Sequence, residues 1–204
     1  MLESRYLLFA CATACALALP GVRGAAVGQT PSPADPKLSL QAALVLTPEF
    51  CATKTKKGTW GINQETFDIG KVICAELEPA LGGVFAGVTR IESSSSPGDA
   101  QVILTPKIIA ITATQAKIAF SNRELVILVE WTAKDKAGKT VWVETVQGSA
   151  KHHIGNSFTY KKNLKLIVDD SAKNLAEQSA NKMSSSPELR KLASGNSSPG
   201  IDKN

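Results

Sequence analysis

Residues 125–146 read LVILVEWTAKDKAGKTVWVETV, and this stretch decides the fold. Apolar and polar residues alternate on both sides of residues 134–139, with the period of two that is typical of half-buried strands. The intervening residues contain Asp135 and Gly138, which are common in tight turns. Two alternating runs around such a turn predict an antiparallel hairpin whose two tryptophans pack in the core.

Further periodic segments flank this hairpin. Asp169 and Asp170 supply capping oxygens and negative charge for the start of a closing helix. The other predicted elements are a strand at 38–46, a helix at 69–84, and strands at 88–92 and 100–114. The resulting order of strand, helix, four strands and helix predicts an α+β domain. We expect a mainly antiparallel sheet of about five strands with two helices packed on one face.

The first 24 residues are typical of an export signal. Arg5 lies in a short head, an apolar run covers 6–19, and small residues follow a Pro-Gly break. The apolar run is shorter than the roughly 20 residues that cross a bilayer. Three alternatives remain open at this stage: cleavage near 24–26, lipidation at Cys15, and an uncleaved anchor.

The rest of the chain divides by composition. Residues 25–37 are a proline-rich flexible linker, 38–192 form one α+β domain, and 193–204 are expected to be a disordered tail. Charged residues interrupt the apolar segments between 102 and 146, so no transmembrane span is predicted in the mature chain. The expected location is outside the cytosol, in the periplasm or at the outer membrane.

Cys51 and Cys74 remain after removal of the signal, and a cysteine pair in an exported protein favours a disulfide. Cys51 follows the first strand and Cys74 lies in the second turn of the next helix, so the two can meet. Two buried free thiols are the alternative. The adjacent His152 and His153 point to opposite faces of a strand, so no metal site is predicted.

Charge is mildly positive, with 23 basic and 18 acidic residues and a formal net charge of +5. This balance permits contact with anionic lipid or glycan. Three tryptophans, two tyrosines and six phenylalanines, with no basic stripe among them, make a nucleic-acid partner unexpected. Two lysine clusters are candidate anion-binding sites, with ordinary solvated surface as the alternative: Lys54, Lys56, Lys57, Lys161, Lys162 and Lys165.

Sequence signatures of catalysis are absent. The chain has no glycine loop for phosphate, nucleophile elbow, paired-histidine helix motif or calcium loop. A helix start accounts for Asp169 and Asp170 without acid–base chemistry. We therefore predict no catalytic residues and no cofactor.

Three stretches carry a family resemblance: AALVLTPEF at 42–50, Ile69-Gly70-Lys71, and DAQVILTP at 99–106. With the hairpin and closing helix, they resemble small bacterial envelope lipoproteins of the YajG type, which share a plan with auxiliary lipoproteins of lipopolysaccharide and lipid export. The resemblance covers about 38–192, although a strong lipidation box is missing. It implies a binding or assembly role at the envelope and no catalytic residues.

Three functions follow from this reading. The first is a non-enzymatic envelope accessory protein that pairs a sheet edge or a helix face with a protein partner. The second is a binder of anionic lipid or glycan through the lysine clusters. The third is an envelope hydrolase of an unfamiliar type.

Overall fold

The computed structural model describes residues 37–56, 66–94, 97–114, 121–154 and 160–195. Its strands are β1 (Leu38–Val45), β2 (Phe85–Ile91), β3 (Val102–Ala113), β4 (Ser121–Asp135) and β5 (Thr140–Ile154). Its helices are α1 (Pro48–Cys51), α2 (Ile69–Gly82), α3 (Tyr160–Ser185) and α4 (Pro187–Gly195). Several predictions lie outside the described residues: the export signal, Cys15, nearly all of the linker, Lys57, and the tail from 196 onward.

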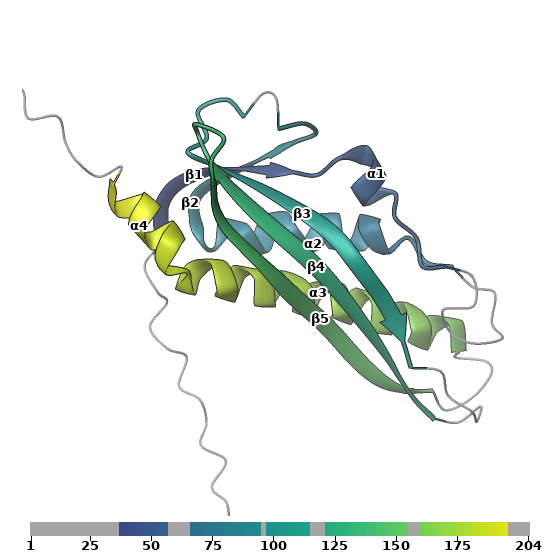
Figure 1. Cartoon of the computed structure of the whole chain (residues 1–204). Coiled ribbons are helices and arrows are strands. Elements are labelled where there is room, and N and C mark those ends of the chain that lie inside the picture. Colours follow the sequence, from purple (N-terminus) through teal and green to yellow (C-terminus); the bar gives the residue numbers. More distant parts are fainter. Residues whose placement is uncertain (1–36, 57–65, 95–96, 115–120, 155–159, 196–204) are drawn as a thin grey trace, which may run out of the picture. The chain divides into compact units, whose positions relative to one another are not determined.

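The five strands form one sheet in the order β2-β1-β3-β4-β5 (Figure 1). β1 is parallel to both β2 and β3, whereas the β3–β4 and β4–β5 pairs are antiparallel. The expected mainly antiparallel sheet is therefore wrong, because the sheet is mixed. α2 carries the chain from β1 to its neighbour β2, and a crossover helix between neighbouring strands makes them parallel.

The hairpin is confirmed. β4 and β5 pair from Ser121 opposite Ile154 to the turn that follows Asp135. The Asp135 carboxylate accepts hydrogen bonds of 2.9 Å from the backbone amides of residues 137 and 139. Gly138 has φ +81°, a left-handed conformation that glycine adopts without steric cost. Turn chemistry and strand alternation therefore agree here.

The two long helices, α2 and α3, lie against the sheet (Figure 1), and α3 is fastened to β4 by buried hydrogen bonds. Trp131 is fully buried, and its indole nitrogen donates to Ser179 of α3 at 3.0 Å. Ser171 of α3 donates to the carbonyl of Leu125 at 3.3 Å. Trp142 is 8 % exposed, so both hairpin tryptophans are core residues, as predicted.

α3 begins at Tyr160, well before the predicted start near 169. Asp169 and Asp170 are therefore inside the helix and do not cap it. Their carboxylates pair with Lys165 and His152. The first turns of α3 contain buried residues whose helical spacing is obscured by interleaved lysines: Leu164, Ile167 and Val168.

The described residues form four helices in place of the expected two, because α1 and α4 are additional short helices. α4 continues to Gly195, so the predicted tail boundary at 193 is wrong. Ala193 is buried, and its carbonyl accepts a hydrogen bond of 3.4 Å from Ser39 of β1. These contacts order α4 beyond residue 192. No helix in the described part of the chain is both long and apolar enough to cross a membrane.

Candidate functional site

β3 has very different neighbours on its two sides. Toward β4 it is paired from Val102 to Ala113. Toward β1, the pairing within the described residues ends at Leu104, which lies opposite Leu44. β1 itself ends at Val45, and the chain then turns into α1. Residues 105–113 therefore present an edge that no described strand pairs.

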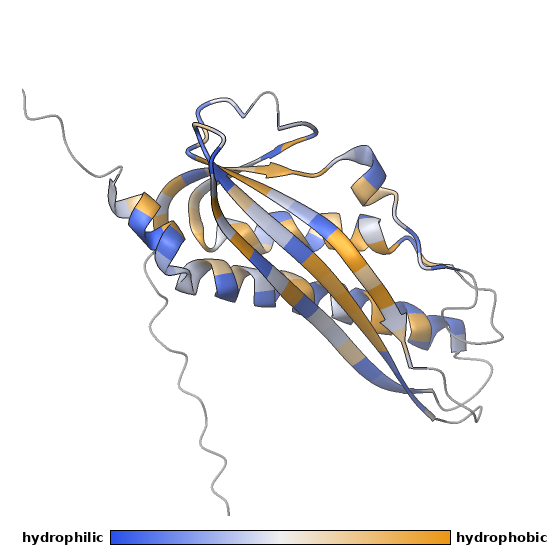
Figure 2. Cartoon of the chain, in the orientation of Figure 1, coloured by the Kyte–Doolittle hydropathy of each residue, from blue (hydrophilic) through white to orange (hydrophobic). Residues whose placement is uncertain are grey.

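A groove of about 740 Å³ runs along this edge. One wall is β3, where Figure 2 shows a hydrophobic stretch. The other wall is α1 and the segment that follows it. Ile109 occupies an irregularity in the pairing with β4 and is 46 % exposed, a high value for so apolar a side chain. We call this cavity the edge groove. Its lining residues are Glu49, Phe50, Thr53, Lys54, Lys56 and 106–111.

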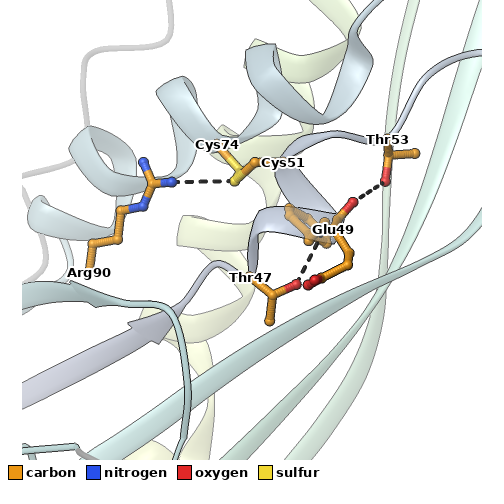
Figure 3. Close-up of a disulfide and its surroundings, with 7 residues drawn as sticks. Thr47, Glu49, Cys51, Thr53, Cys74 and Arg90 are labelled. Atoms are coloured by element: carbon orange, nitrogen blue, oxygen red, sulfur yellow. Dashed lines mark hydrogen bonds between the residues drawn. A yellow bond between two sulfur atoms is a disulfide. The ribbon is translucent and has the colours of Figure 1, made fainter.

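α1, which forms this wall, is only four residues long, and residues of α2 and β2 hold it in place. None of its four residues is fully buried. A disulfide joins Cys51 to Cys74 of α2, in agreement with the sequence prediction, and Arg90 of β2 donates to the Cys51 sulfur at 3.5 Å (Figure 3). A Cβ on Gly70 would lie 2.2 Å from the Phe50 carbonyl oxygen, so only glycine lets α2 approach α1 this closely.

The start of α1 is set by Thr47. Its hydroxyl accepts from the Phe50 amide at 3.2 Å, which is a standard N-cap interaction, and Pro48 occupies the first turn. Hydrogen bonds from its own backbone amide and from the Thr47 hydroxyl lower the pKa of the Glu49 carboxyl below its ordinary value. At the sequence Thr-Pro-Glu-Phe, residues 47–50, the chain has therefore left the sheet and forms α1, which is one wall of the groove.

The structure places the predicted lysines at different positions, with different partners. Lys54 and Lys56 line the edge groove, and Lys54 pairs with Asp68 at 3.0 Å. On α3, Lys165 pairs with Asp169. Lys161 and Lys162 are exposed in the first turn of the same helix, and Lys57 is outside the described residues.

A second groove, of about 450 Å³, lies between α2 and α3. Lys71, Lys165, Asp68 and Asp169 line it. Asp68 is also the partner of Lys54, and Lys165 is the one member of the predicted lysine clusters among the lining residues. The apolar part of the lining consists of Phe67, Val72, Ala75 and Val168.

His152 pairs with a carboxylate. Its Nε2 lies 2.6 Å from Asp170. Among the described residues, no group of three or more histidine, cysteine or acidic side chains could hold a metal ion. Arg123, the cross-strand neighbour of His152, is only 6 % exposed. Its Nε and Nη1 have no hydrogen-bond partner in the described part of the chain.

No protein-family model and no curated protein matches the sequence. Among solved structures, the fold is similar to protein XCC0632 from Xanthomonas campestris, of the family DUF330. That match has a TM-score of 0.50 at 12 % identity over 76 % of this chain and 94 % of the other. The shared fold does not by itself establish a shared activity.

Two further structures match less closely in space. A minor lipoprotein from Acinetobacter baumannii is 14 % identical over 73 % of this chain and 93 % of its own, with a TM-score of 0.45. A protein of the PelC dodecamer from Paraburkholderia phytofirmans is 16 % identical over 72 % and 92 %, with a TM-score of 0.41. The comparisons do not single out the YajG type.

Pro106 cannot donate to a ladder, so the sequence predicts either a bulge in the run of 100–114 or an edge position for it. The structure shows an irregularity between Ile108 and Ala110 and an open edge beyond Leu104. The apolar run of 100–114 is longer than that of the first strand, which stops at Pro48. A long strand beside a shorter one must extend past it. Only the strand order, which depends on tertiary packing, shows that these two strands are neighbours.

Proposed function

We propose that this chain is a non-enzymatic accessory protein of the bacterial cell envelope that binds a protein partner along the open edge of β3. The observation that carries this proposal is the edge groove: residues 105–113 of β3 have no strand partner on one side among the described residues, and residues 106–111 line a cavity of about 740 Å³ there. Strand addition at such an edge uses main-chain hydrogen bonds for affinity and side-chain pockets for specificity.

Two features support the envelope location. Residues 1–24 are typical of an export signal, and the Cys51–Cys74 disulfide suits an oxidising compartment. In this proposal the protein works in the periplasm or at the outer membrane, with Cys15 as the attachment point if it is lipidated.

Charged variants on two different strands test the edge. Ile109 on β3 and Val143 on β5 are both exposed apolar side chains, at 46 % and 54 %. Native envelopes that contain wild-type protein, Ile109→Glu or Val143→Glu would be chemically cross-linked, and the captured proteins quantified by mass spectrometry. We expect Ile109→Glu to lose about tenfold of its specific partner, because it puts a charge in place of an apolar side chain that lines the groove, and Val143→Glu to retain it. Equal capture by both variants would contradict the proposal.

A second function, binding of anionic lipid or glycan, is favoured by the groove between α2 and α3. It combines an apolar lining with Lys71 and Lys165, and two aspartates share the lining, of which Asp169 pairs with Lys165. Sedimentation with phosphatidylglycerol and phosphatidylcholine vesicles at low salt tests this function. Lys71→Glu should reduce recovery with the anionic vesicles, whereas Lys139→Glu, in the hairpin turn, should not. Equal recovery with both vesicle types would exclude binding of anionic lipid.

A further inference from the structure

We infer that the groove between α2 and α3 binds one molecule of a lipid-like amphiphile, which has an anionic head group and a hydrocarbon chain. This inference rests on the second proposed function, because it names the ligand class of that same groove. Three observations support it: the unpaired charge of Lys71, the apolar side chains beside this lysine, and the volume of the groove.

The ion pairs of the groove leave one positive charge over. Its charged lining residues are Lys71, Lys165, Asp68 and Asp169. Lys165 pairs with Asp169. Asp68 pairs at 3.0 Å with Lys54, which does not line this groove. Both aspartates are therefore occupied, and Lys71 has no ion pair within the described part of the chain.

A neighbouring hollow of about 370 Å³ gives the same charge count. Asp68 and Lys71 line it as well, so the two hollows meet at the start of α2. The other charged residue in its described lining is Lys54, which is the partner of Asp68. Among the described residues that line the two hollows, every carboxylate is thus paired with a lysine other than Lys71. The free ammonium group of Lys71 favours an anion at this point.

The side chains beside Lys71 are apolar. Phe67, Val72 and Ala75 line the groove at the start of α2 and along it, and Val168 lines it from α3. Phe67 and Val72 are only partly buried, so they keep apolar surface that a ligand can cover. A hydrocarbon chain would remove this surface from water, which favours binding. A sugar would place hydroxyl groups against the same side chains without hydrogen-bond partners.

The volume of the groove suits a single small molecule. It is about 450 Å³, and binding sites for small molecules commonly enclose roughly 300–1,000 Å³. The head group would lie at Lys71, and the chain would lie along the apolar side chains between the two helices, which run side by side (Figure 1). The groove therefore matches a lipid-like ligand better than an anionic sugar.

Titration of the full chain, with its disulfide intact, tests the inference. The probes are decyl sulfate, decyl maltoside and decyltrimethylammonium below their micellar concentrations, and a sulfated disaccharide that has the charge without the chain. Calorimetry gives affinity and stoichiometry, and hydrogen exchange locates the bound probe. We expect decyl sulfate to bind one-to-one, about tenfold more tightly than either other amphiphile at low salt. It should protect the start of α2 and the facing turns of α3, and its advantage should shrink at high salt.

Two variants separate the charge from the apolar contact. Lys71→Gln should reduce the affinity for decyl sulfate to that for decyl maltoside. Lys173→Gln, at an exposed position of α3 outside the groove, is the matched control and should change neither affinity. Val72→Thr keeps the shape of the side chain but adds a hydroxyl group, so it should weaken the binding of all three amphiphiles. Urea unfolding checks that each variant is folded.

The outcomes distinguish this inference from the second proposed function. Equal affinity of the three amphiphiles would overturn the anionic head group, and disaccharide binding as tight as that of decyl sulfate would overturn the hydrocarbon chain. If no amphiphile binds but phosphatidylglycerol vesicles still recover the protein through Lys71, the inference is wrong and the second function stands. If neither amphiphiles nor vesicles bind, both are wrong.

Discussion

α3 and α1 are held to the rest of the protein in opposite ways. α3 has nine buried residues, and Ser171 and Ser179 fasten it to the backbone and to the tryptophan of β4. α1 has no fully buried residue, and it is held at its end by one disulfide and by the close approach of Gly70.

Because of this difference, the elements that stabilise the fold are not the ones that are accessible to a partner. β4 is paired on both sides and lies beneath α3, so opening it requires disruption of the core. The open edge of β3 is flanked by the least buried helix of the domain. Segments that receive partners are commonly drawn from the regions with the fewest buried contacts. The α3–β4 layer is expected to govern unfolding, and the α1–β3 corner to govern binding.

The largest expected effect is in the α3–β4 layer. Trp131→Ala removes a fully buried indole and its hydrogen bond to Ser179, and should lower the free energy of unfolding by about 3–5 kcal/mol. Trp131→Phe should cost less because most of the volume is retained. Urea unfolding measures both variants. A loss below about 1 kcal/mol for Trp131→Ala would mean that this layer is not the stabilising one.

Removal of the disulfide should affect both stability and the groove wall. The Cys51→Ser, Cys74→Ser double variant should lose about 3 kcal/mol, because the cross-link restricts the unfolded chain. Hydrogen exchange of α1 should rise more than that of α3. Unchanged exchange in α1 would show that Gly70 packing holds this wall without the disulfide.

Arg123, on β4, is a destabilising residue within the α3–β4 layer. Its guanidinium is buried, and two of its nitrogens lack partners within the described residues. Arg123→Met should raise the free energy of unfolding by about 1–3 kcal/mol, because methionine has no unpaired donors. Arg90→Met, at an exposed position near the disulfide, is the matched control. If Arg123→Met destabilises the protein, the guanidinium has a stabilising partner.

The smallest effect concerns acid stability of the α1–β3 corner. The pKa of Glu49 is lower in the folded protein, so its ionised form contributes stability above the ordinary value of 4.5, and this contribution is lost as pH falls through the folded pKa. Glu49→Gln should therefore flatten the acid side of the stability profile slightly. Glu92→Gln is the control. A profile for Glu49→Gln identical to wild type would contradict this assignment.

Local patterns predicted the parts of the fold that depend on neighbouring residues. The hairpin, the order of the five strands and the two long helices, and the cysteine pair belong to this group. The parallel pairing of β1 was missed, although its crossover through α2 implies it. The early turns of α3 were missed because Lys161, Lys162 and Lys165 are mixed with the few buried residues of this segment. The open edge depends on which strands become neighbours, and that is decided by packing across the whole sheet.

The central claim is that β3 receives an extended segment of another protein. Its most direct test replaces Ile109 with a photo-reactive amino acid, irradiates intact native cells, and sequences the cross-linked peptides, with Val143 as the matched position. The account predicts a dominant adduct at 109 to one segment of one other protein, with little yield at 143. No adduct at 109, an adduct to this chain itself, or equal yields at both positions would contradict it.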